Sequence, residues 1–271
     1  MNIQDIVKIL TDSGIEPNEA NIEVKMLIEH FANYTAKDLI LGKKLDSDKL
    51  KIVEEKAKLR AQTRQPIQHI IGFADFMGEK FIVNKDVLIP RDETEILVRK
   101  AIEIIDRKGF KTALDMGTGS GCIACSIAKH TNCQIIGADI SSDALNTALD
   151  NASRLNLYNK AIFRKSDVYS NIRETFDIII SNPPYIPPKT ELQKEVQFDP
   201  KTALFTNDEK GLEFYEKIST NAPLNRGGYL LFELGIGQSD DVKKIMETNG
   251  FKDIEIIKDL AGIDRVIFGH I

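Results

Sequence analysis

Several features that would assign this chain to a familiar class are missing from its sequence. Cysteine is scarce, with three residues in 271, too few for a disulfide framework. Basic residues (36) are outnumbered by acidic ones (41), and the formal net charge of −5 gives no overall attraction to a phosphate backbone. No secretion signal and no apolar run long enough to span a bilayer are found. We expect a cytoplasmic protein that contacts neither a membrane nor nucleic acid.

Sequence signatures of metal and phosphate sites are missing as well. Cys122 and Cys125 form an isolated C-x-x-C with no second pair or histidine cluster. We interpret them as small buried residues of a helix rather than as a metal or redox site. No G-K-[ST] follows the glycines at 117–121, which excludes a P-loop. Cys122 also replaces the third glycine of the dinucleotide-binding fingerprint.

The chain divides into regions of different pattern. No strand is predicted before about residue 65, where apolar residues such as Ile6 and Leu10 recur at helical spacing. Glycines and phenylalanines within residues 67–83 predict one or two short strands that form a hairpin. The predicted division is a helical domain at 1–72, a hairpin linker at 73–90 and a second domain at 91–271.

From Lys111 onward, predicted strands and helices alternate. The strands are 112–116, 134–140, 161–167, 176–181, 228–234, 252–258 and 265–269; the helices are 121–129, 142–155, 210–221 and 239–249. This alternation is typical of an α/β sheet with helices on both faces. The ligand site of such a sheet lies beyond the carboxyl ends of its strands.

The first three of these strands end in residues that suit a nucleoside. Gly117, Gly119 and Gly121 let the backbone turn tightly and approach a ligand closely. Asp139 ends the second strand, where a carboxylate can accept hydrogen bonds from both ribose hydroxyls. Asp167 ends the third strand and suits an adenine amino group. Each carboxylate could instead cap a helix or turn, but the combination favours a nucleoside site.

The fourth strand, 176–181, contains three consecutive isoleucines and stops at Asn182-Pro183-Pro184-Tyr185. Residues before proline are extended and prolines donate no hydrogen bond, so the turn is stiff and rich in acceptors. The Asn182 side-chain oxygen and the Pro183 carbonyl are two acceptors that suit a planar NH2 group. Tyr185 could cover that group as a lid. The alternative is a Pro-Pro loop in which the asparagine is only a cap.

The nucleoside site alone is compatible with either a nicotinamide dinucleotide or S-adenosylmethionine. A hydride-transfer enzyme has no evident need for an Asn-Pro-Pro-Tyr acceptor frame beside its cofactor. A methyl donor facing a planar NH2 group does need one, so the fourth strand favours S-adenosylmethionine.

The sequence also resembles a known family. GTGSG at 117–121, Asp139 and NPPY at 182–185 resemble class I S-adenosylmethionine-dependent methyltransferases, and NPPY marks those that methylate nitrogen on amides or bases. Over essentially the whole chain, the sequence is similar to HemK-type release factor glutamine methyltransferases. The similar segments, in the same order, are QPIQHIIGFADFMGEKF, VLIPRDETEILV, ALDMGTGSGCIA, IIISNPPYIP and FDPKTALF.

The resemblance implies a Rossmann-like domain with a mostly parallel seven-stranded sheet and an N-terminal domain that recognises the substrate. It also implies methyl transfer to the glutamine of the Gly-Gly-Gln loop of peptide chain release factors, by a monomer. Implied cofactor-binding residues are Gly117, Thr118, Gly119, Ser120, Gly121, Asp139, Asp167, Val168 and Asn182. Implied catalytic residues are Asn182, Pro183 and Tyr185, and Pro184 completes the implied substrate site.

Three positions depart from the family pattern. Val168 stands where an aromatic residue is frequent, His69 where tyrosine is common, and Asp92 where a proline usually follows the Pro-Arg pair. None of them lies in NPPY. Arg91 could contact a ligand or pair with the acidic turn that follows it, and Glu233 could lie near the site without an assigned role.

Two other functions remain to be distinguished. NPPY fits an N-methyltransferase that acts on an amino group of an RNA or DNA base equally well, although the acidic charge balance disfavours it. A catalytically silent binding module would keep the fold, but the intact glycine turn, Asp139 and NPPY count against it. Stabilisation of the protein by S-adenosylmethionine would separate the enzymes from the silent module.

Overall fold

The computed structural model describes residues 2–43 and 45–271, so Met1 and Lys44 of the predicted N-terminal domain lie outside the described residues. The chain forms two compact units. The helical unit extends to Phe73 and also includes Leu192–Phe198, a segment from much later in the chain. The sheet unit comprises Ala74–Glu191 and Asp199–Ile271. None of the helices in the described ranges is long and apolar enough to cross a membrane.

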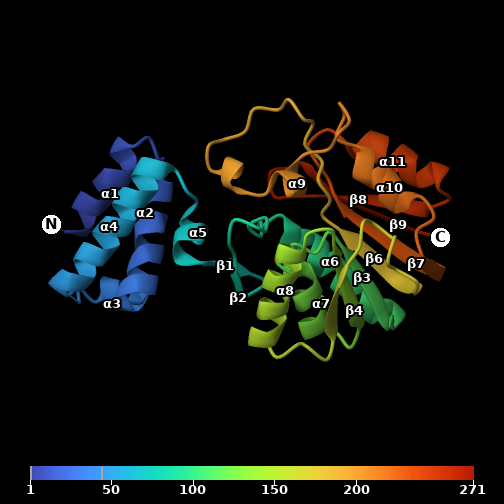
Figure 1. Ribbon diagram of the computed structural model, residues 1–271, viewed down its shortest axis with the longest axis horizontal. Helices are drawn as coiled ribbons and strands as arrows, with labels where there is room; N and C mark the ends of the chain where they lie inside the picture. Colours follow the sequence, from blue (N-terminus) through green and yellow to red (C-terminus); the bar gives the residue numbers. More distant parts are fainter. Residues whose placement is uncertain (1, 44) are drawn as a thin grey trace. The chain divides into compact units, whose positions relative to one another are not determined.

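The helical unit is built from amphipathic helices. They are α1 (Ile3–Asp12), α2 (Pro17–Leu27) with a π-helical turn at Ile28–Ala32, α3 (Ala36–Ile40), α4 (Ser47–Thr63) and α5 (Ile67–Ile71) (Figure 1). Asn2 and Asp5 form a capping box that begins α1. The apolar stripes expected from the sequence are buried, as shown by Leu10, Val24 and Val53, each with no exposed surface.

The expectation of strand structure from residue 67 is wrong for its first five residues, which form α5. Pro66 precedes this helix, and Gly72 ends it in the left-handed conformation, donating its N–H to the Gln68 carbonyl at 2.7 Å. Ile67 is buried in the core of the helical unit, with Ile70 and Ile71 packed against it. Packing on other helices therefore overrides the strand propensity of the isoleucines.

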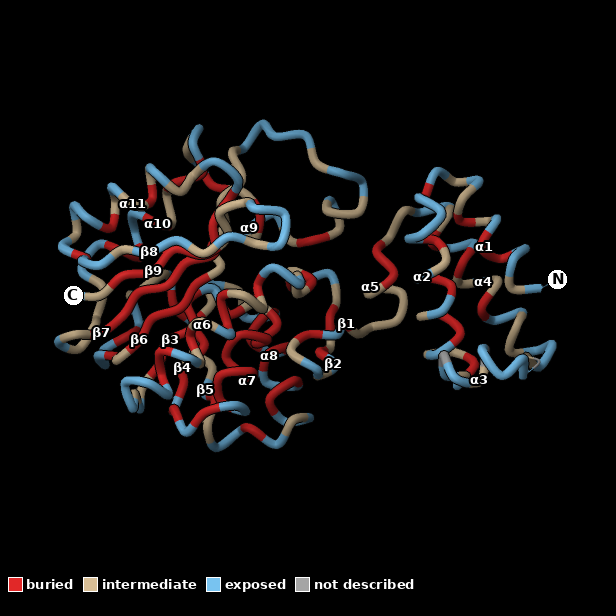
Figure 2. The backbone as a smooth tube through the Cα atoms, turned by 180° about the vertical axis from the view of Figure 1, so that it is seen from behind, coloured by how far each residue is buried: buried red, intermediate tan, exposed pale blue. Residues whose placement is uncertain are grey.

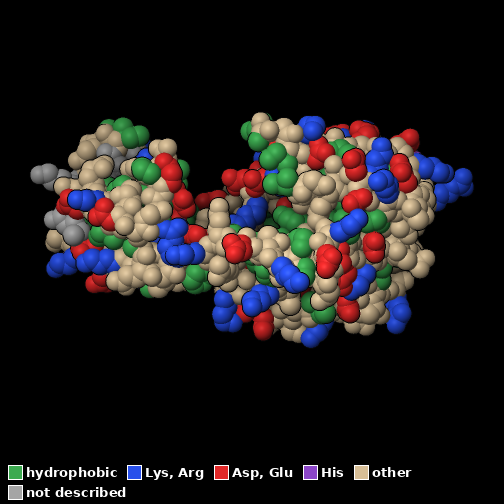
Figure 3. All heavy atoms as spheres, turned by 90° about the horizontal axis from the view of Figure 1, so that it is seen from above, with side chains coloured by type: hydrophobic (Ala, Val, Ile, Leu, Met, Phe, Trp, Pro, Cys, Tyr) green, Lys and Arg blue, Asp and Glu red, His purple; other side chains and the backbone are tan. Residues whose placement is uncertain are grey.

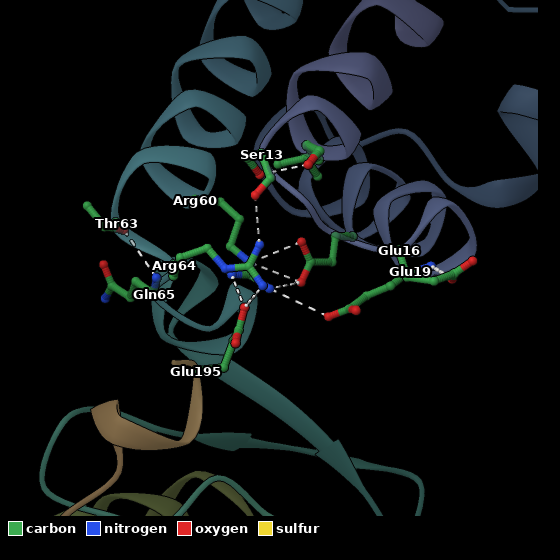
Figure 4. A network of polar contacts seen from close by, with 10 residues as sticks. Ser13, Glu16, Glu19, Arg60, Thr63, Arg64, Gln65 and Glu195 are labelled. Atoms are coloured by element: carbon green, nitrogen blue, oxygen red, sulfur yellow. Dashed lines mark hydrogen bonds and ion pairs between the residues drawn. The ribbon is translucent and has the colours of Figure 1, made fainter. Parts of the chain in front are cut away.

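A buried arginine lies inside the helical unit, where the sequence suggests only solvated charges. Arg60 of α4 is 1% exposed, and its guanidinium donates to both oxygens of the buried Glu23 at 3.0 and 3.1 Å. It also donates to Glu195 at 3.0 Å, and Arg64 pairs with the same Glu195 oxygen at 2.6 Å (Figure 4). Arg60 thereby fixes the segment Leu192–Phe198 within this unit.

The sheet unit begins with a hairpin of β1 (Phe73–Phe76) and β2 (Glu79–Ile82). Met77 and Gly78 both have positive φ, as a two-residue hairpin turn that matches strand twist requires. The main sheet has the order β5-β4-β3-β6-β7-β9-β8, in which β9 runs antiparallel to β7 and to β8 and all other neighbouring strands are parallel. The Rossmann-like α/β class and the mostly parallel seven-stranded sheet are confirmed.

The strands of the main sheet agree with the expected ones to within a few residues. They are β3 (Thr112–Met116), β4 (Gln134–Asp139), β5 (Ala161–Lys165), β6 (Phe176–Ser181), β7 (Leu224–Glu233), β8 (Lys252–Lys258) and β9 (Asp264–His270). The helices of this unit are α6 (Thr94–Lys108), α7 (Cys122–His130), α8 (Ser142–Arg154), α9 (Lys201–Leu204), α10 (Glu213–Ser219) and α11 (Ser239–Thr248). β5 ends at Lys165, so Asp167 lies in the following turn.

Two hydrophobic cores enclose the sheet. Ile178 and Ile180 of β6 pack with α6 and α7 on one face, while Ile179 packs with α10 and α11 on the other. All three isoleucines have no exposed surface, and the central strands are buried along most of their length in Figure 2. The double burial confirms the interpretation of this run as a central strand. Cys122 and Cys125 are buried in the first core, as expected for packing residues.

Candidate active site

Four neighbouring strands bring the expected site residues to one edge of the sheet. β4, β3, β6 and β7 are adjacent and parallel, so their carboxyl ends lie together (Figure 1). Met116 is in register with Ser181, and Ser181 with Phe232. The glycine turn follows β3, Asp139 ends β4, NPPY follows β6 and Glu233 ends β7. The site is therefore assembled from residues that are far apart in the sequence.

The glycine turn bends back across the end of β4. Gly117 and Thr118 both donate their N–H groups to the Ala138 carbonyl, at 2.8 and 2.9 Å. Gly117 and Gly119 have φ of 77° and 52°, and a methyl group at either would point into open space. Gly121 also has positive φ, but a Cβ there would lie 2.9 Å from the Cβ of Ala148 on α8. The first two glycines leave room for a ligand, and the third allows α7 and α8 to pack.

The Asp115 side chain supports the glycine turn through hydrogen bonds. Its carboxylate accepts hydrogen bonds from the Thr118 hydroxyl at 2.5 Å and from the Ala124 N–H at 3.1 Å. The side chain is completely buried, and its other oxygen, Oδ1, has no hydrogen-bond partner among the described residues. Burial raises the pKa of Asp115 to about 7, against the hydrogen bonds that favour its charge. This buried carboxylate is a contact that the sequence did not single out.

Asp139 lies beside the glycine turn. Its Oδ2 accepts the Gly119 N–H at 2.9 Å, and its Oδ1 accepts the Ser141 N–H at 2.9 Å. The cap of α8 is Ser141, whose hydroxyl accepts the Ala144 N–H, so Asp139 does not cap that helix and caps only the turn at Ser141. Burial raises the pKa of Asp139 against these hydrogen bonds.

The turn after β5 holds Asp167 and Val168. Asp167 is exposed, and its N–H donates to the Ser170 hydroxyl at 3.0 Å. Val168 has φ of 46°, a strained conformation for a β-branched residue. The Ser166 hydroxyl donates to the Val168 carbonyl at 2.6 Å and accepts the Asn171 N–H at 3.0 Å. This brace keeps the strained residue in place, as is common where a backbone borders a site.

Tyr185 is held by residues that the sequence did not identify. The Gln238 side chain donates from Nε2 to the Tyr185 carbonyl at 3.0 Å, and its Oε1 accepts the Gly235 N–H at 3.1 Å. A Cβ at Gly211 would lie 2.1 Å from the Tyr185 carbonyl oxygen, and one at Gly235 would lie 3.0 Å from its ring. Both glycines therefore make room for Tyr185. In the sequence, nothing distinguishes these two positions except that each is a glycine.

Asn182 is joined to two buried residues. Its Nδ2 donates to the Thr94 hydroxyl at 3.3 Å, and that hydroxyl donates to the Glu233 carboxylate at 2.6 Å. Thr94 and Glu233 are each 2% exposed, whereas Asn182 is half-buried. Burial raises the pKa of Glu233 to about 7, although Thr94, Arg265 and Asn182 favour its charge. Glu233 therefore lies at the site, behind Asn182.

Arg91 does not form the expected ion pair with the acidic turn, and its role as a ligand contact stays a prediction. It pairs with Asp199 at 2.7 Å rather than with the acidic turn of residues 92–95. Asp199 is buried and also accepts the Ile89 N–H at 3.4 Å. The segment after Asp199 then pairs with the end of NPPY, since Ile186 donates to the Leu204 carbonyl at 3.0 Å. Arg91 therefore anchors the segment that supports NPPY.

These features fit S-adenosylmethionine. The glycine turn offers open space at Gly117 and Gly119, which a Cβ would occupy. Asp139 supplies acceptors beside that space, and Asp115, which bonds Thr118 of the same turn, has an unpartnered buried oxygen. No group of ligands that could hold a metal ion is found among the described residues. The donors and acceptors at this edge of the sheet are those that a nucleoside and an amino acid group require.

Comparisons with known proteins agree with this geometry. The model of the methyltransferase small domain matches residues 93–205. Among solved structures, a methyltransferase from Pyrococcus furiosus superposes with a TM-score of 0.53 at 20% identity, covering 72% of this chain and 90% of that one. The hMettl16 catalytic domain in complex with an RNA hairpin gives 0.56 at 16% identity, covering 79% and 81%. These likenesses establish the fold alone.

Sequence relatives go further than the fold. The release factor glutamine methyltransferase of Flavobacterium psychrophilum is 37% identical over 89% of this chain and 88% of its own. The enzyme of the same name from Geobacter sulfurreducens is 36% identical over 97% and 93%. That from Buchnera aphidicola is 35% identical over 99% and 98%. The chain therefore belongs to the family of release factor glutamine methyltransferases.

Proposed function

We propose that this enzyme transfers a methyl group from S-adenosylmethionine to the side-chain amide nitrogen of a glutamine in the Gly-Gly-Gln loop of peptide chain release factors. The observation that carries the proposal is the acceptor frame at the end of β6. Asn182 turns its NH2 group toward Thr94, which leaves its Oδ1 for another donor. The Pro183 carbonyl is the second acceptor, because a proline-rich turn offers acceptors and few donors.

An amide nitrogen is a weak nucleophile, since its lone pair is delocalised into the carbonyl group. We therefore assign the chain's residues mainly to alignment. Asn182 Oδ1 and the Pro183 carbonyl each accept one N–H of the glutamine amide and point the nitrogen along the line of attack. The same acceptors favour the positive charge that develops on the nitrogen. Tyr185, held by Gln238, covers the planar amide.

When bound, S-adenosylmethionine would supply a methyl group on a positively charged sulfur, and that sulfur would keep the electron pair of the carbon–sulfur bond when the methyl group passes to the glutamine nitrogen. Gly117, Thr118, Gly119, Ser120 and Gly121 would hold it, together with Asp139, Asp167 and Val168. The glutamine nitrogen then releases one proton to solvent. Removal of that proton needs no strong base, because the newly methylated nitrogen still carries both hydrogens and a positive charge, and is therefore far more acidic than the neutral amide.

On one face of the molecule, the arrangement of charges favours a protein substrate. On the face drawn in Figure 3, lysine and arginine side chains are interspersed with aspartate and glutamate rather than gathered in a continuous stripe. A nucleic-acid substrate is usually bound through such a stripe. We propose that the enzyme is a cytoplasmic monomer that meets its release factor without direct contact with nucleic acid, and that the helical unit contributes to recognition.

The test is incubation with labelled S-adenosylmethionine and, separately, a purified release factor and total RNA, followed by mass spectrometry. We expect the label on the glutamine of Gly-Gly-Gln. A release factor whose glutamine is replaced by alanine is the matched control and should remain unlabelled. Label on an RNA base, with none on the release factor, would overturn the proposed substrate.

A further inference from the structure

The chain of hydrogen bonds behind Asn182 has a direction. An ionised carboxylate only accepts hydrogen bonds, so the single hydroxyl hydrogen of Thr94 is directed to Glu233, 2.6 Å away. The Thr94 oxygen is then left with lone pairs alone. The Asn182 atom that faces it at 3.3 Å must therefore be the donor Nδ2. The opposite orientation of the amide would place two acceptors against each other.

We propose that Glu233, acting on Asn182 directly and through Thr94, is a positioning residue that sets the orientation of the Asn182 amide so that its Oδ1 faces the substrate. The inference rests on the proposed function, since it names what orients the acceptor for the glutamine N–H. The oxygen and the NH2 group of an asparagine amide are nearly equal in shape, and only the oxygen accepts hydrogen bonds. Without a directed partner, part of the population would present the NH2 group to the substrate's own NH2.

The surroundings of Glu233 make this direction depend on its charge. Arg265 lies near enough to favour the ionised form, and Glu93 opposes it. Tyr185 and Cys122 also face the carboxylate: their own burial raises their pKa values, and the negative charge of Glu233 raises them further. Tyr215 bonds to the Glu233 carbonyl rather than to its carboxylate, at 3.0 Å. The carboxylate is thus held in a site where it can gain a proton close to neutral pH.

Protonation of Glu233 would release the orientation. A neutral carboxyl group can donate to the Thr94 oxygen, and the Thr94 hydrogen is then free to donate to Asn182 Oδ1. The amide would turn, and its acceptor would be lost to the substrate. We therefore expect kcat/KM to fall as the pH drops through the pKa of Glu233, with the affinity for S-adenosylmethionine unchanged.

Glu233→Gln tests the inference, because glutamine has the shape of the protonated acid. We expect kcat/KM to fall about tenfold at pH 8, less than the hundredfold for loss of an entire oriented contact. The acid limb of the pH profile that is due to Glu233 should disappear. Thr94→Ser keeps the hydroxyl and should stay within about threefold of the parent enzyme. Tyr229→Phe changes the same strand four residues before Glu233, and is the matched control.

A measurement without turnover separates orientation from a general structural role. In the cofactor-free protein, the side-chain 15N–1H resonances of Asn182 should shift with the ionisation of Glu233, and they should be independent of pH in Glu233→Gln. If Glu233→Gln does not fold, Thr94→Val replaces it and should lose activity about tenfold, while Thr94→Ser retains it.

The proposal is overturned if Glu233→Gln keeps the parent kcat/KM and acid limb, or if Tyr229→Phe loses as much activity. These comparisons are made relative to the parent enzyme on whichever substrate it methylates. If the parent enzyme labels an RNA base and not glutamine, the proposed substrate is wrong. The comparison of variants on that base still decides the role of Glu233.

Discussion

Replacement of Arg60 by methionine should open the helical unit. Methionine fills much of the same volume but leaves Glu23 without its partner in a site that is only 5% exposed. Removal of one partner from a buried ion pair costs about 3 to 5 kcal/mol. The unit has about 80 residues, and a unit of that size is stabilised by roughly 4 to 12 kcal/mol. The substitution should therefore remove a large part of its stability.

Hydrogen exchange measures this effect in the helical unit itself. Amides of α1, α2 and α4 should exchange at least a hundredfold faster in Arg60→Met, since 1.4 kcal/mol corresponds to a factor of about ten. Lys58→Met is the matched control on the same helix, because Lys58 pairs with Glu54 on the surface and its side chain is 52% exposed. That pair should contribute at most about 0.5 kcal/mol.

A double variant distinguishes the unpaired charge from lost packing. Arg60→Met combined with Glu23→Met removes both charges, and it should recover most of the stability that Arg60→Met loses. The reasoning is refuted if Arg60→Met speeds exchange no more than Lys58→Met does. It is also refuted if the double variant is less stable than Arg60→Met alone.

Three further predictions concern the sheet unit. Gly121→Ala places a Cβ 2.9 Å from that of Ala148, so cofactor affinity should fall at least tenfold, measured by calorimetry; unchanged affinity would contradict the role given to this glycine. Asp139→Ala should abolish most of the rise in melting temperature that S-adenosylmethionine produces, and a rise equal to that of the parent would count against the ribose contact. Glu233 has its pKa raised from 4.5 to about 7, so its contribution to stability is complete below pH 4.5 and is lost as pH rises to 7. Between these two pH values, urea titrations should show that the free energy of unfolding falls by roughly 3 kcal/mol more in the parent than in Glu233→Gln. An equal fall in the two proteins would contradict the raised pKa.

The strands that carry the site could be predicted because the burial of a strand is visible in the apolar residues of the strand itself. The run at 176–181 is β-branched and lies between two cores, so its sequence is apolar on both faces. The glycine turn and Asp139 follow strands directly, and the topology rule for parallel sheets then places them together. The roles of Asp167 and Val168 as ligand contacts stay predictions, since the structure shows only their turn.

The supporting contacts could not be predicted, because they join residues that are distant in the sequence. Thr94 and Glu233 are 139 residues apart, and Gln238 is 53 residues from Tyr185. Arg60 reads as one of several charges on a polar helix, and only its partners show that it is buried. The short helix α5 was missed because isoleucines favour strands unless tertiary packing decides otherwise.

The most direct test of the central claim is the single-turnover rate of methylation of a release factor by Asn182→Ala, with S-adenosylmethionine bound to saturation. The account predicts a rate at saturation at least about a hundredfold below that of the parent, because one of two aligned acceptors is lost. A rate within a few-fold of the parent would contradict the claim that Asn182 aligns the glutamine nitrogen.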